Sequence, residues 1–352
     1  MDFGHHRERL SEYILEYLAV KSKDLALVSK WGEDVIDRLR PYIINGKLLR
    51  GCLIMATSEL LSQKPADENS LKAAAAIEIM NSSLLIHDDI FDNDNMRRGQ
   101  ESVHYQYEKY ALKHDFKNPA GFGRSVGTCV GDIGFFMSIE LLSSIDIDRA
   151  AKDSMLSIYS QEVCKLGIAE IDDLHLENSD VEISVHQILK MYEYKTAHYS
   201  FTLPLILGAI IAGKPDGQFI EHLRSIGKSI GLIYQIKDDE LGIFADEKIL
   251  GKSVGIDIRS NKKTLHRHYL FENANSEDKK IMDTIFGKSN ASIDEINSVR
   301  TFMHRYLVDK IVEEKIHSIE KEFVKSLSEI SGEESFKKML EMLLHYVSNR
   351  KK

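Results

Sequence analysis

The stretch SLKAAAAIEIMNSSLLIHDDIFD, residues 70–92, decides the fold class of this chain. Its apolar residues recur three and four positions apart, which is the period of an α-helix. The same period recurs along almost all of the 352 residues, alternating strand patterns are scarce, and only five prolines occur. The sequence therefore predicts an all-α protein.

Helices are expected on both sides of this stretch, and no linker, repeat or change of composition marks a domain boundary. Apolar residues make up 43% of the chain, which is enough for a large core. We therefore expect a single domain over residues 1–352. The expected helices are 7–31, 33–40 with an end near Pro41, one from the 44–51 junction to about Leu61, 70–92, 124–143, 147–176, 184–212 and 216–245, and three more follow the loop 250–264.

Charge and cysteine content limit the partners and the compartment. The formal net charge of −9 disfavours nucleic-acid binding. Three scattered cysteines form no metal-binding pattern, which indicates reduced thiols in a cytoplasmic protein. The longest apolar stretch, residues 203–213, is too short to span a bilayer, and the first residues lack the apolar core of a secretory signal. We expect no membrane span.

The end of the opening stretch carries the first chemical signal. Asp88 and Asp92 are four positions apart, so a helix places them one turn apart on one face. Such like charges repel, whereas Mg²⁺ prefers carboxylate oxygens and commonly shares substrate phosphates. This pattern predicts a magnesium–diphosphate platform. The alternative is a solvated acidic helix end, which the core-type run SLLIH before the acids disfavours because it places them at the edge of a cavity.

A second acidic pair follows another apolar helix far downstream. Asp238 and Asp239 lie in the segment YQIKDDELG. Two acidic pairs for metal, together with basic residues for phosphate oxygens, are typical of a site for two diphosphate groups. The basic residues are Lys47, Arg50, Arg97, Arg98, Lys195, Lys252 and Lys262.

These motifs occur in an order that resembles the trans-isoprenyl diphosphate synthases, most closely those that make geranylgeranyl diphosphate. The resemblance runs from about residue 44 to 264 and rests on GKLLRG, DDIFD, RRG, YKTA, YQIKDD and GKSVGIDIRSNKKT. It implies a helical bundle around a central cavity, a homodimer, and three Mg²⁺ ions when both diphosphates are bound. The substrates would be isopentenyl diphosphate and an allylic prenyl diphosphate.

The resemblance also implies a role for each motif residue. The metal ligands would be Asp88, Asp89, Asp92, Asp238 and Asp239, with Asp89 in a supporting role. Isopentenyl diphosphate would be bound by Lys47, Arg50, Asn81 and Arg98. The allylic diphosphate would be bound by Arg97, Lys195, Lys252 and Lys262. The catalytic group would be Lys195, Thr196 and Gln235, with Asp88, Asp92 and Asp238.

Three positions depart from the family pattern. Asn81 replaces a histidine that usually precedes the first aspartate by seven positions, so a neutral amide would contact the phosphate. Gly242 stands where a third aspartate is common, which leaves Asp238 as the main ligand of the second motif. Glu170 replaces a glutamine, and we assign it no role.

The family resemblance places the residues that limit product length below the first acidic pair. The position five residues before Asp88 holds a small side chain, Ser83, with Leu84 beside it and Met80 closer to the Asp88 face. Without an aromatic side chain there, we expect a C20 product, with longer chains or farnesyl diphosphate as alternatives. Ser83→Phe is expected to shorten the product, and Met80→Ala to lengthen it.

Other function classes are weaker interpretations of the same residues. A metal phosphohydrolase would use His87 and Asp88 but needs further histidines upstream, where only those at 5 and 6 occur. A terpene cyclase would not need Lys47 and Arg50. A non-catalytic regulatory subunit remains open because of the departures described above. Tyr192 is expected to be a core or lining residue.

Overall fold

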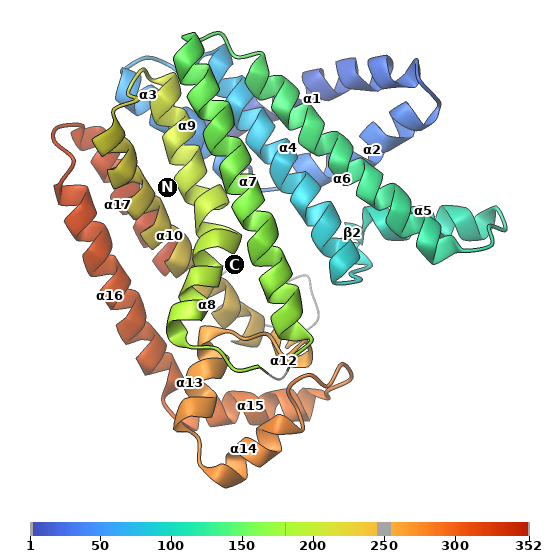
Figure 1. The fold of residues 1–352 in the computed structure, drawn as a ribbon, viewed down its shortest axis with the longest axis vertical. Helices are drawn as coiled ribbons and strands as arrows, with labels where there is room; N and C mark the ends of the chain where they lie inside the picture. Colours follow the sequence, from blue (N-terminus) through green and yellow to red (C-terminus); the bar gives the residue numbers. More distant parts are fainter. Residues whose placement is uncertain (1–2, 180, 245–254, 351–352) are drawn as a thin grey trace. The chain divides into compact units, whose positions relative to one another are not determined.

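The computed structural model describes residues 3–179, 181–244 and 255–350. Over these ranges the chain is helical apart from loops and one two-stranded hairpin (Figure 1). The predicted all-α class is confirmed. The chain divides into two compact units, residues 2–157 with 204–215 (the N-terminal unit) and residues 158–203 with 216–352 (the C-terminal unit). The single domain expected from the sequence stays a prediction.

The N-terminal unit is organised around α4, whose residues are mostly buried. This helix packs against α3 and α6, and α1 and α2 pack against each other beside it. The elements are α1 (Gly4–Ala26), α2 (Trp31–Ile44), α3 (Leu49–Ser62), α4 (Glu68–Phe91), β1 (Met96–Arg97), β2 (Gln100–Glu101), α5 (Val103–Lys113), α6 (Pro119–Ser143), the start of α7 (Arg149–Glu177), and α9 (Leu203–Ile211), whose first residue belongs to the C-terminal unit.

Close packing of α6 fixes the rotation of α4. The N-cap Asp67 starts α4 by accepting a hydrogen bond from the Ser70 N–H over 2.9 Å. Glycines of α6 face α4, and a Cβ at Gly131 would lie 2.3 Å from His87 Nε2. Only glycine allows so close an approach of the two helices. The helix that carries the first acidic pair therefore has one defined face toward α6.

The C-terminal unit is organised around α10, which packs against η1, α16 and α17. η1 is a π-helix, in which backbone hydrogen bonds join residues five positions apart instead of four. The elements are the rest of α7, α8 (Val185–Tyr192), η1 (Glu193–Thr202), α10 (Gly217–Phe244), α12 (Ile256–Arg259), α13 (Leu265–Asn273), α14 (Ser276–Asp283), α15 (Ile293–Arg305), α16 (Val308–Ser328) and α17 (Glu334–Ser348).

Several predicted boundaries are wrong. The second helix continues through Pro41 to Ile44, because the proline lies in the last turn and its carbonyl still accepts from the Asn45 N–H. The predicted helix 184–212 is interrupted by η1, and five helices, not three, occupy the described residues after position 264. α5 and the hairpin have no counterpart among the predicted elements.

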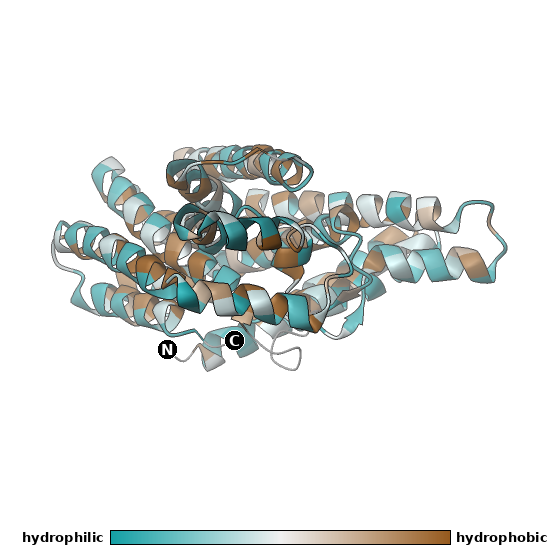
Figure 2. Cartoon of the chain, turned by 90° about the horizontal axis from the view of Figure 1, so that it is seen from below, coloured by the Kyte–Doolittle hydropathy of each residue, from teal (hydrophilic) through white to brown (hydrophobic). Residues whose placement is uncertain are grey.

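Hydrophobic and hydrophilic segments alternate along most of the helices (Figure 2), whereas α4 is buried on most of its surface. By length and composition alone, α6 is the one helix among the described residues that could cross a membrane. Core helices of soluble proteins pass the same test, so this is a weak indication.

Candidate active site

The two carboxylates of the first acidic pair have different surroundings. The Asp88 side chain is 29% exposed, whereas that of Asp89 is fully buried. Asp92 caps the end of α4, where its N–H donates to the Asp88 carbonyl over 2.9 Å, and it is exposed. Asp88 and Asp92 therefore lie one helical turn apart, and both have access to solvent.

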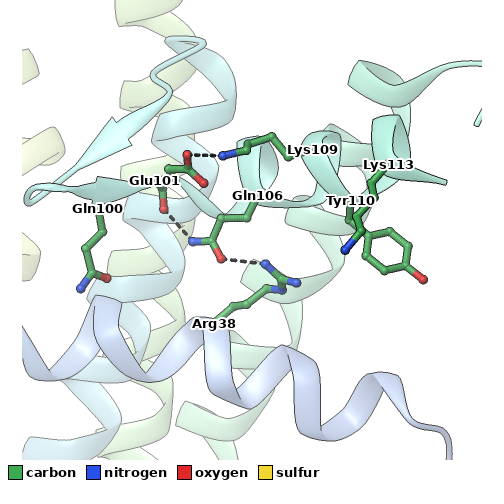
Figure 3. Close-up of a pocket in the computed structure, with 7 residues that line it drawn as sticks. All are labelled: Arg38, Gln100, Glu101, Gln106, Lys109, Tyr110 and Lys113. Carbon is green, nitrogen blue, oxygen red and sulfur yellow. Dashed lines mark hydrogen bonds and ion pairs between the residues drawn. The ribbon is translucent and has the colours of Figure 1, made fainter. Parts of the chain in front are cut away.

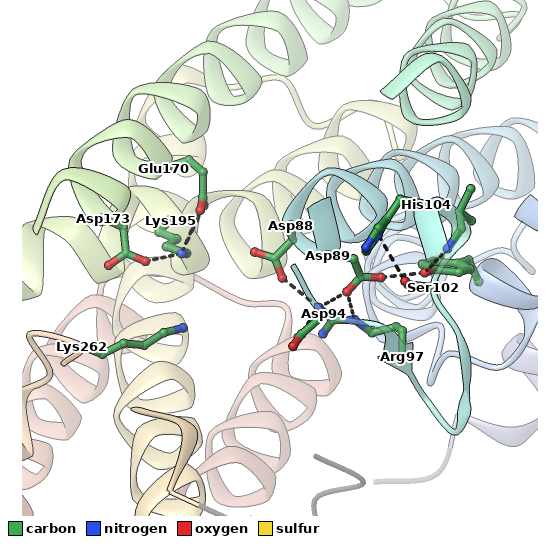
Figure 4. Close-up of polar contacts among 12 residues, drawn as sticks. Asp88, Asp89, Asp94, Arg97, Ser102, His104, Glu170, Asp173, Lys195 and Lys262 are labelled. Atoms are coloured by element: carbon green, nitrogen blue, oxygen red, sulfur yellow. Dashed lines mark hydrogen bonds and ion pairs between the residues drawn. The ribbon is translucent and has the colours of Figure 1, made fainter. Parts of the chain in front are cut away.

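Arg97 of the hairpin ties the acidic residues together (Figure 4). Its Nε donates to Asp89 Oδ1 over 2.6 Å and its Nη2 donates to Asp88 Oδ2 over 3.1 Å. A carboxylate oxygen of Asp94 lies 3.7 Å from the same Nη2. Burial opposes the charge of Arg97, but Asp89 and Asp88 outweigh it and raise its pKa. The guanidinium thus contacts the carboxylates that were predicted to hold metal.

Asp89 is held inside the protein from both sides. Its Oδ2 accepts a hydrogen bond from the Tyr42 hydroxyl over 2.6 Å, and its Oδ1 accepts from Arg97. Burial raises the pKa of Asp89, and Arg97 and Tyr42 oppose the rise. Direct ligation of a metal by Asp89 does not fit this placement, because both oxygens are engaged and the side chain is buried. The supporting role fits it.

Two of the predicted isopentenyl diphosphate ligands lie near the junction of α2 and α3. Lys47 is exposed, one residue before the left-handed Leu48 that starts α3. Arg98 donates from Nη1 to the Tyr42 carbonyl over 2.6 Å. A Cβ at Gly46 would come within 2.8 Å of the same Nη1, so the glycine makes room for the guanidinium.

Glu78 is a buried acid that the sequence analysis missed. Its Oε1 accepts from the Gly51 N–H over 2.8 Å. Burial raises its pKa, and the positive charges of Arg50 and Arg98 lower it. The structure therefore brings these two arginines around one carboxylate. The signal was the single acid within the apolar run AAAAIEIM. Asn81, three residues later, is buried.

The outer aspartate of the second pair contacts the end of the chain. Asp238 is 50% exposed, and its Oδ1 accepts from Nη1 of Arg350 over 2.8 Å. The guanidinium lies 4.3 Å from the centre of the Tyr234 ring, within range of a cation–π interaction. Asp238 is thus the open carboxylate of this motif.

The inner aspartate of the second pair is buried like Asp89. Asp239 accepts hydrogen bonds from the Tyr192 hydroxyl and from Nε2 of Gln235, the latter over 2.7 Å. The Oε1 of Gln235 accepts from the Thr196 hydroxyl over 2.6 Å. Thr196, Gln235 and Asp239 therefore form a continuous series of hydrogen bonds. As with Asp89, direct metal ligation by Asp239 does not fit its burial.

Asp257 is a second acid that the sequence analysis missed. A Cβ at Gly242 would lie 2.5 Å from Asp257 Oδ2, so this carboxylate lies beside the position where the family commonly has a third aspartate. Burial raises the pKa of Asp239, and the negative charge of Asp257 adds to the rise. The spacing of the acidic motif could not reveal Asp257, because it comes from a separate segment.

Lys195 lies on η1 and contacts two acids of α7 (Figure 4). Its Nζ donates to Asp173 and, over 3.2 Å, to Glu170. Glu170, to which we assigned no role, thus helps to hold the ammonium group. Lys262 lies just before α13 and is partly exposed. Lys252 lies outside the described residues.

The predicted length-limiting residues differ in exposure. Ser83 is buried, its hydroxyl donates to the Ile79 carbonyl over 3.0 Å, and a Cβ at Gly134 of α6 would lie 2.1 Å from its Oγ. Met80 is also buried. Leu84 is partly exposed and lies one turn before Asp88, on the same face of α4.

The donor set fits Mg²⁺ better than a metal that needs a complete protein cage. Asp88 and Asp92 in the N-terminal unit, and Asp238 in the C-terminal unit, each supply accessible hard oxygens, and Mg²⁺ is usually held by one or two carboxylates with water and phosphate. No group of three histidine, cysteine or acidic side chains placed to hold a metal occurs among the residues that the structure describes.

A surface hollow of about 710 Å³ lies beside the hairpin (Figure 3). Its polar groups bind one another: Gln106 accepts from Arg38 and donates to the Glu101 carbonyl, and Lys109 donates to the Glu101 carboxylate. None of the residues that line it is a predicted site residue.

A sequence model of the polyprenyl synthetase family matches residues 33–303. The chain belongs to this family. Its enzyme class is therefore that of the trans-prenyltransferases, as the motifs predicted.

Relatives and solved structures agree with this assignment. The chain is 29% identical over 316 residues to a geranylgeranyl diphosphate synthase of Sulfolobus acidocaldarius, covering 88% of this chain and 89% of the relative. It is 32% identical over 251 residues to a short chain isoprenyl diphosphate synthase of Methanocaldococcus jannaschii, covering 71% and 70%. A geranylgeranyl pyrophosphate synthase of Corynebacterium glutamicum, crystallised with isoprenyl diphosphate and magnesium, matches with a TM-score of 0.91 and 26% identity over 100% of both chains.

Proposed function

We propose that this protein condenses isopentenyl diphosphate head to tail with an allylic diphosphate, in a Mg²⁺-dependent reaction that yields a C20 all-trans prenyl diphosphate. One observation carries the proposal: each acidic motif has accessible carboxylates beside a buried one. In the first motif Asp88 and Asp92 are accessible and Asp89 is buried. In the second motif Asp238 is accessible and Asp239 is buried. That arrangement suits metal-assisted binding of diphosphate better than a simple acidic surface.

Isopentenyl diphosphate would be bound by the cations near the α2–α3 junction. Lys47 and Arg98 would contact its phosphate oxygens, and Arg50 would do so from beside the buried Glu78. A guanidinium suits this task because its planar donors match phosphate geometry. Asn81 is buried, so its contact with the diphosphate is the weakest of these assignments.

The allylic diphosphate would be bound by Arg97, Lys195 and Lys262, and by Lys252 from outside the described residues. Mg²⁺, in three ions when both substrates are bound, would supply further positive charge to the diphosphate oxygens. As the allylic C–O bond breaks, the arginine and lysine side chains would stabilise the negative charge of the departing diphosphate. A positive charge then develops on the allylic carbon.

The hydrogen-bonded pair of Thr196 and Gln235 would direct oxygen dipoles toward this allylic cation. The double bond of isopentenyl diphosphate attacks the cation, which forms the new C–C bond and leaves the positive charge on the branched carbon of the isopentenyl unit. A proton then leaves the CH₂ group next to that carbon, its C–H electrons form the new double bond, and the departed diphosphate is the proposed base. No side-chain nucleophile is required, because the leaving group departs before the bond forms.

The C20 length rests on the relatives named for geranylgeranyl diphosphate and on the absence of an aromatic side chain at Met80, Ser83 and Leu84. Chains longer than C20 and farnesyl diphosphate are the alternatives. We also propose a homodimer, supported by the exposed apolar side chains of α6, and a cytoplasmic location, supported by three free cysteines.

The deciding experiment supplies Mg²⁺, radiolabelled isopentenyl diphosphate, and dimethylallyl, geranyl or farnesyl diphosphate in separate reactions. Chromatography of the products is expected to show C20, with no incorporation in the presence of a chelator and recovery after Mg²⁺ is restored. A product longer than C20 corrects only the length. No incorporation from any primer would contradict the proposed activity and favour a non-catalytic subunit.

A further inference from the structure

The two aspartate pairs have matching surroundings, although they belong to different units of the chain. In each pair the first aspartate is partly exposed and contacts an arginine, while the second is buried and accepts from a tyrosine hydroxyl. Tyr42 donates to Asp89, and Tyr192 donates to Asp239. In both cases tyrosine and aspartate are 47 residues apart.

Each tyrosine hydroxyl also accepts a backbone hydrogen bond from the first residue of a helix. The Val103 N–H, at the start of α5, donates to Tyr42 over 3.1 Å. The Leu265 N–H, at the start of α13, donates to Tyr192 over 2.9 Å. Such N–H groups have no acceptor within their own helix. One oxygen thus joins the tyrosine's own helix, the aspartate helix and the start of a third helix.

The chain that leads into each of these third helices carries cations. Arg97 and Arg98 lie in the hairpin shortly before α5, and Lys262 and Lys263 lie directly before α13. A hydroxyl has one proton to donate and oxygen lone pairs to accept. Here the hydroxyl proton is donated to the buried aspartate, and the oxygen accepts from the first helical residue after the cation-bearing segment. In both units the tyrosine hydroxyl therefore connects the helix that carries the proposed metal ligands to the helix that follows the proposed phosphate-binding segment.

We propose that Tyr42 and Tyr192 are positioning residues for the two metal–diphosphate subsites. Each hydroxyl holds the second aspartate inward, which leaves the first aspartate directed outward, and anchors the cation-bearing segment beside it. This inference rests on the proposed function, because it concerns where metal and diphosphate bind. The tyrosines themselves touch neither.

The same type of hydrogen bond occurs elsewhere in each unit and supplies matched controls. In the N-terminal unit, the buried Tyr107 donates to Asp34 over 2.7 Å. In the C-terminal unit, Tyr306 donates to Asp278 over 2.6 Å and accepts from the Asn275 N–H over 3.2 Å. Phenylalanine at either control position removes a comparable bond without touching an acidic pair.

The experiment compares Tyr42→Phe and Tyr192→Phe with Tyr107→Phe, Tyr306→Phe and the parent. Mg²⁺ is titrated at a fixed concentration of inorganic pyrophosphate, and the rise in melting temperature gives the Mg²⁺ concentration for half of the full stabilisation. We expect the two site variants to need about tenfold more Mg²⁺, as loss of one hydrogen bond to a charged group implies. The controls should stay within about twofold of the parent.

A second readout separates positioning from general loss of stability. Prenyl synthesis by the site variants should recover to within about twofold of the parent when Mg²⁺ is raised, because the carboxylates that bind the ion remain. Equal Mg²⁺ dependence in site and control variants would overturn the inference while leaving the proposed function intact. So would failure of both site variants to fold while both controls fold, since the hydroxyls would then hold the whole fold.

The parent protein distinguishes this inference from the proposed function. A parent that neither gains stability from Mg²⁺ with pyrophosphate nor makes a prenyl diphosphate overturns the proposed function, and the inference with it. A responsive parent makes the comparison of variants decisive. If only one site variant folds, the same comparison is made with that variant and the control from its unit.

Discussion

Asp88 and Asp89 are neighbours in the sequence, but their side chains enter different surroundings. The partly exposed Asp88 and the exposed Asp92 are placed to bind metal, so Asp88→Ala and Asp92→Ala should each lower turnover at least a thousandfold, about 4 kcal/mol of transition-state stabilisation. Asp89→Ala should instead lower the melting temperature strongly, because it leaves the buried Tyr42 and Arg97 without their shared partner. Steady-state kinetics and thermal unfolding of the purified variants measure both effects.

Asp37 supplies a control for this prediction, because it is an exposed aspartate of α2. Asp37→Ala should change neither turnover nor melting temperature appreciably. Near-normal turnover in Asp88→Ala or Asp92→Ala would show that the metal is bound elsewhere.

The sequence predicted which residues form the acidic motifs but not which carboxylate of each pair is open. A helix of ideal period shows that Asp88 and Asp92 share a face. It does not show that Asp89 turns inward, because that depends on Tyr42, which lies 47 residues earlier. Asp257 and Glu78 were missed for the same reason: their partners come from other segments.

At the scale of elements, the packing of α4 on α6 changes the prediction for product length. Ser83 faces Gly134 of α6, so the ring of Ser83→Phe has no room and should destabilise the fold by about 1–3 kcal/mol through overpacking. Leu84 is partly exposed on the Asp88 face, so Leu84→Phe should shorten the main product and Leu84→Ala should lengthen it. Chromatographic product length and thermal unfolding of the three variants test this.

The results for the Ser83 and Leu84 variants show which face of α4 limits the product length. A folded Ser83→Phe with a shortened product would restore the family-based assignment. An unchanged product distribution in both Leu84 variants, with activity retained, would place the limiting residue on another helix.

A buried ion-pair cluster links η1 to α7 and predicts a pH dependence of stability. The His198 ring contacts Glu162 at 2.5 Å and Glu193 at 3.3 Å. Burial would raise the pKa of Glu162, but hydrogen bonds from His198 and Lys165 outweigh it and hold the pKa at about 2. Burial would lower the pKa of His198, but the two glutamates outweigh it and raise the pKa.

These directions fix the pH range in which the cluster stabilises the fold. The contribution of Glu162 is present above its unfolded pKa of about 4.3 and is lost as the pH falls toward its folded value. The contribution of His198 is present below about pH 6.5 and is lost as the pH rises through its raised folded pKa. Glu162→Gln should therefore destabilise the protein most between about pH 4.5 and 6.5, by about 2–3 kcal/mol.

Urea unfolding at several pH values measures this difference between parent and variant. The exposed Glu322 supplies the control, and Glu322→Gln should follow the parent at every pH. A destabilisation by Glu162→Gln that stays constant from pH 3 to pH 8 would contradict the assigned charges.

Element boundaries were predicted well where the backbone stays α-helical and poorly where it departs from the α-helix without a change in the apolar pattern. The helices around the first acidic motif follow a regular apolar repeat, and α4 lies close to its expected range. Residues 184–212 keep a helical pattern throughout, so the π-helix within them gives no separate signal in composition. Within it, Lys195 and His198 pair with Asp173 and Glu162 of α7, which are contacts that the local pattern does not reveal.

At the scale of the whole molecule, the order of the motifs predicted the family. Each motif is short and common by itself, but few protein families have all of them in this order over about 220 residues. The division of the chain into two compact units could not be predicted, since contacts between distant segments define it. Residues 204–215 illustrate this, because they follow the π-helix in sequence but belong to the N-terminal unit.

The proposed homodimer is the remaining property of the whole molecule, and α6 offers a test of it. One face of α6 packs on α4 through glycines, while on another face Phe136 is 70% exposed and Ile139 is also exposed. A contiguous exposed apolar patch marks an interaction site, and these two side chains, three positions apart, share one face of α6. Phe136→Glu should therefore raise the dissociation constant of the dimer at least about a hundredfold, because it would bury an unpaired charge. Val324→Glu, on an exposed position of α16, is the control and should leave the dimer intact. Sedimentation velocity over a range of concentrations measures both, and a Phe136→Glu protein with the parent's dimer affinity would place the interface elsewhere.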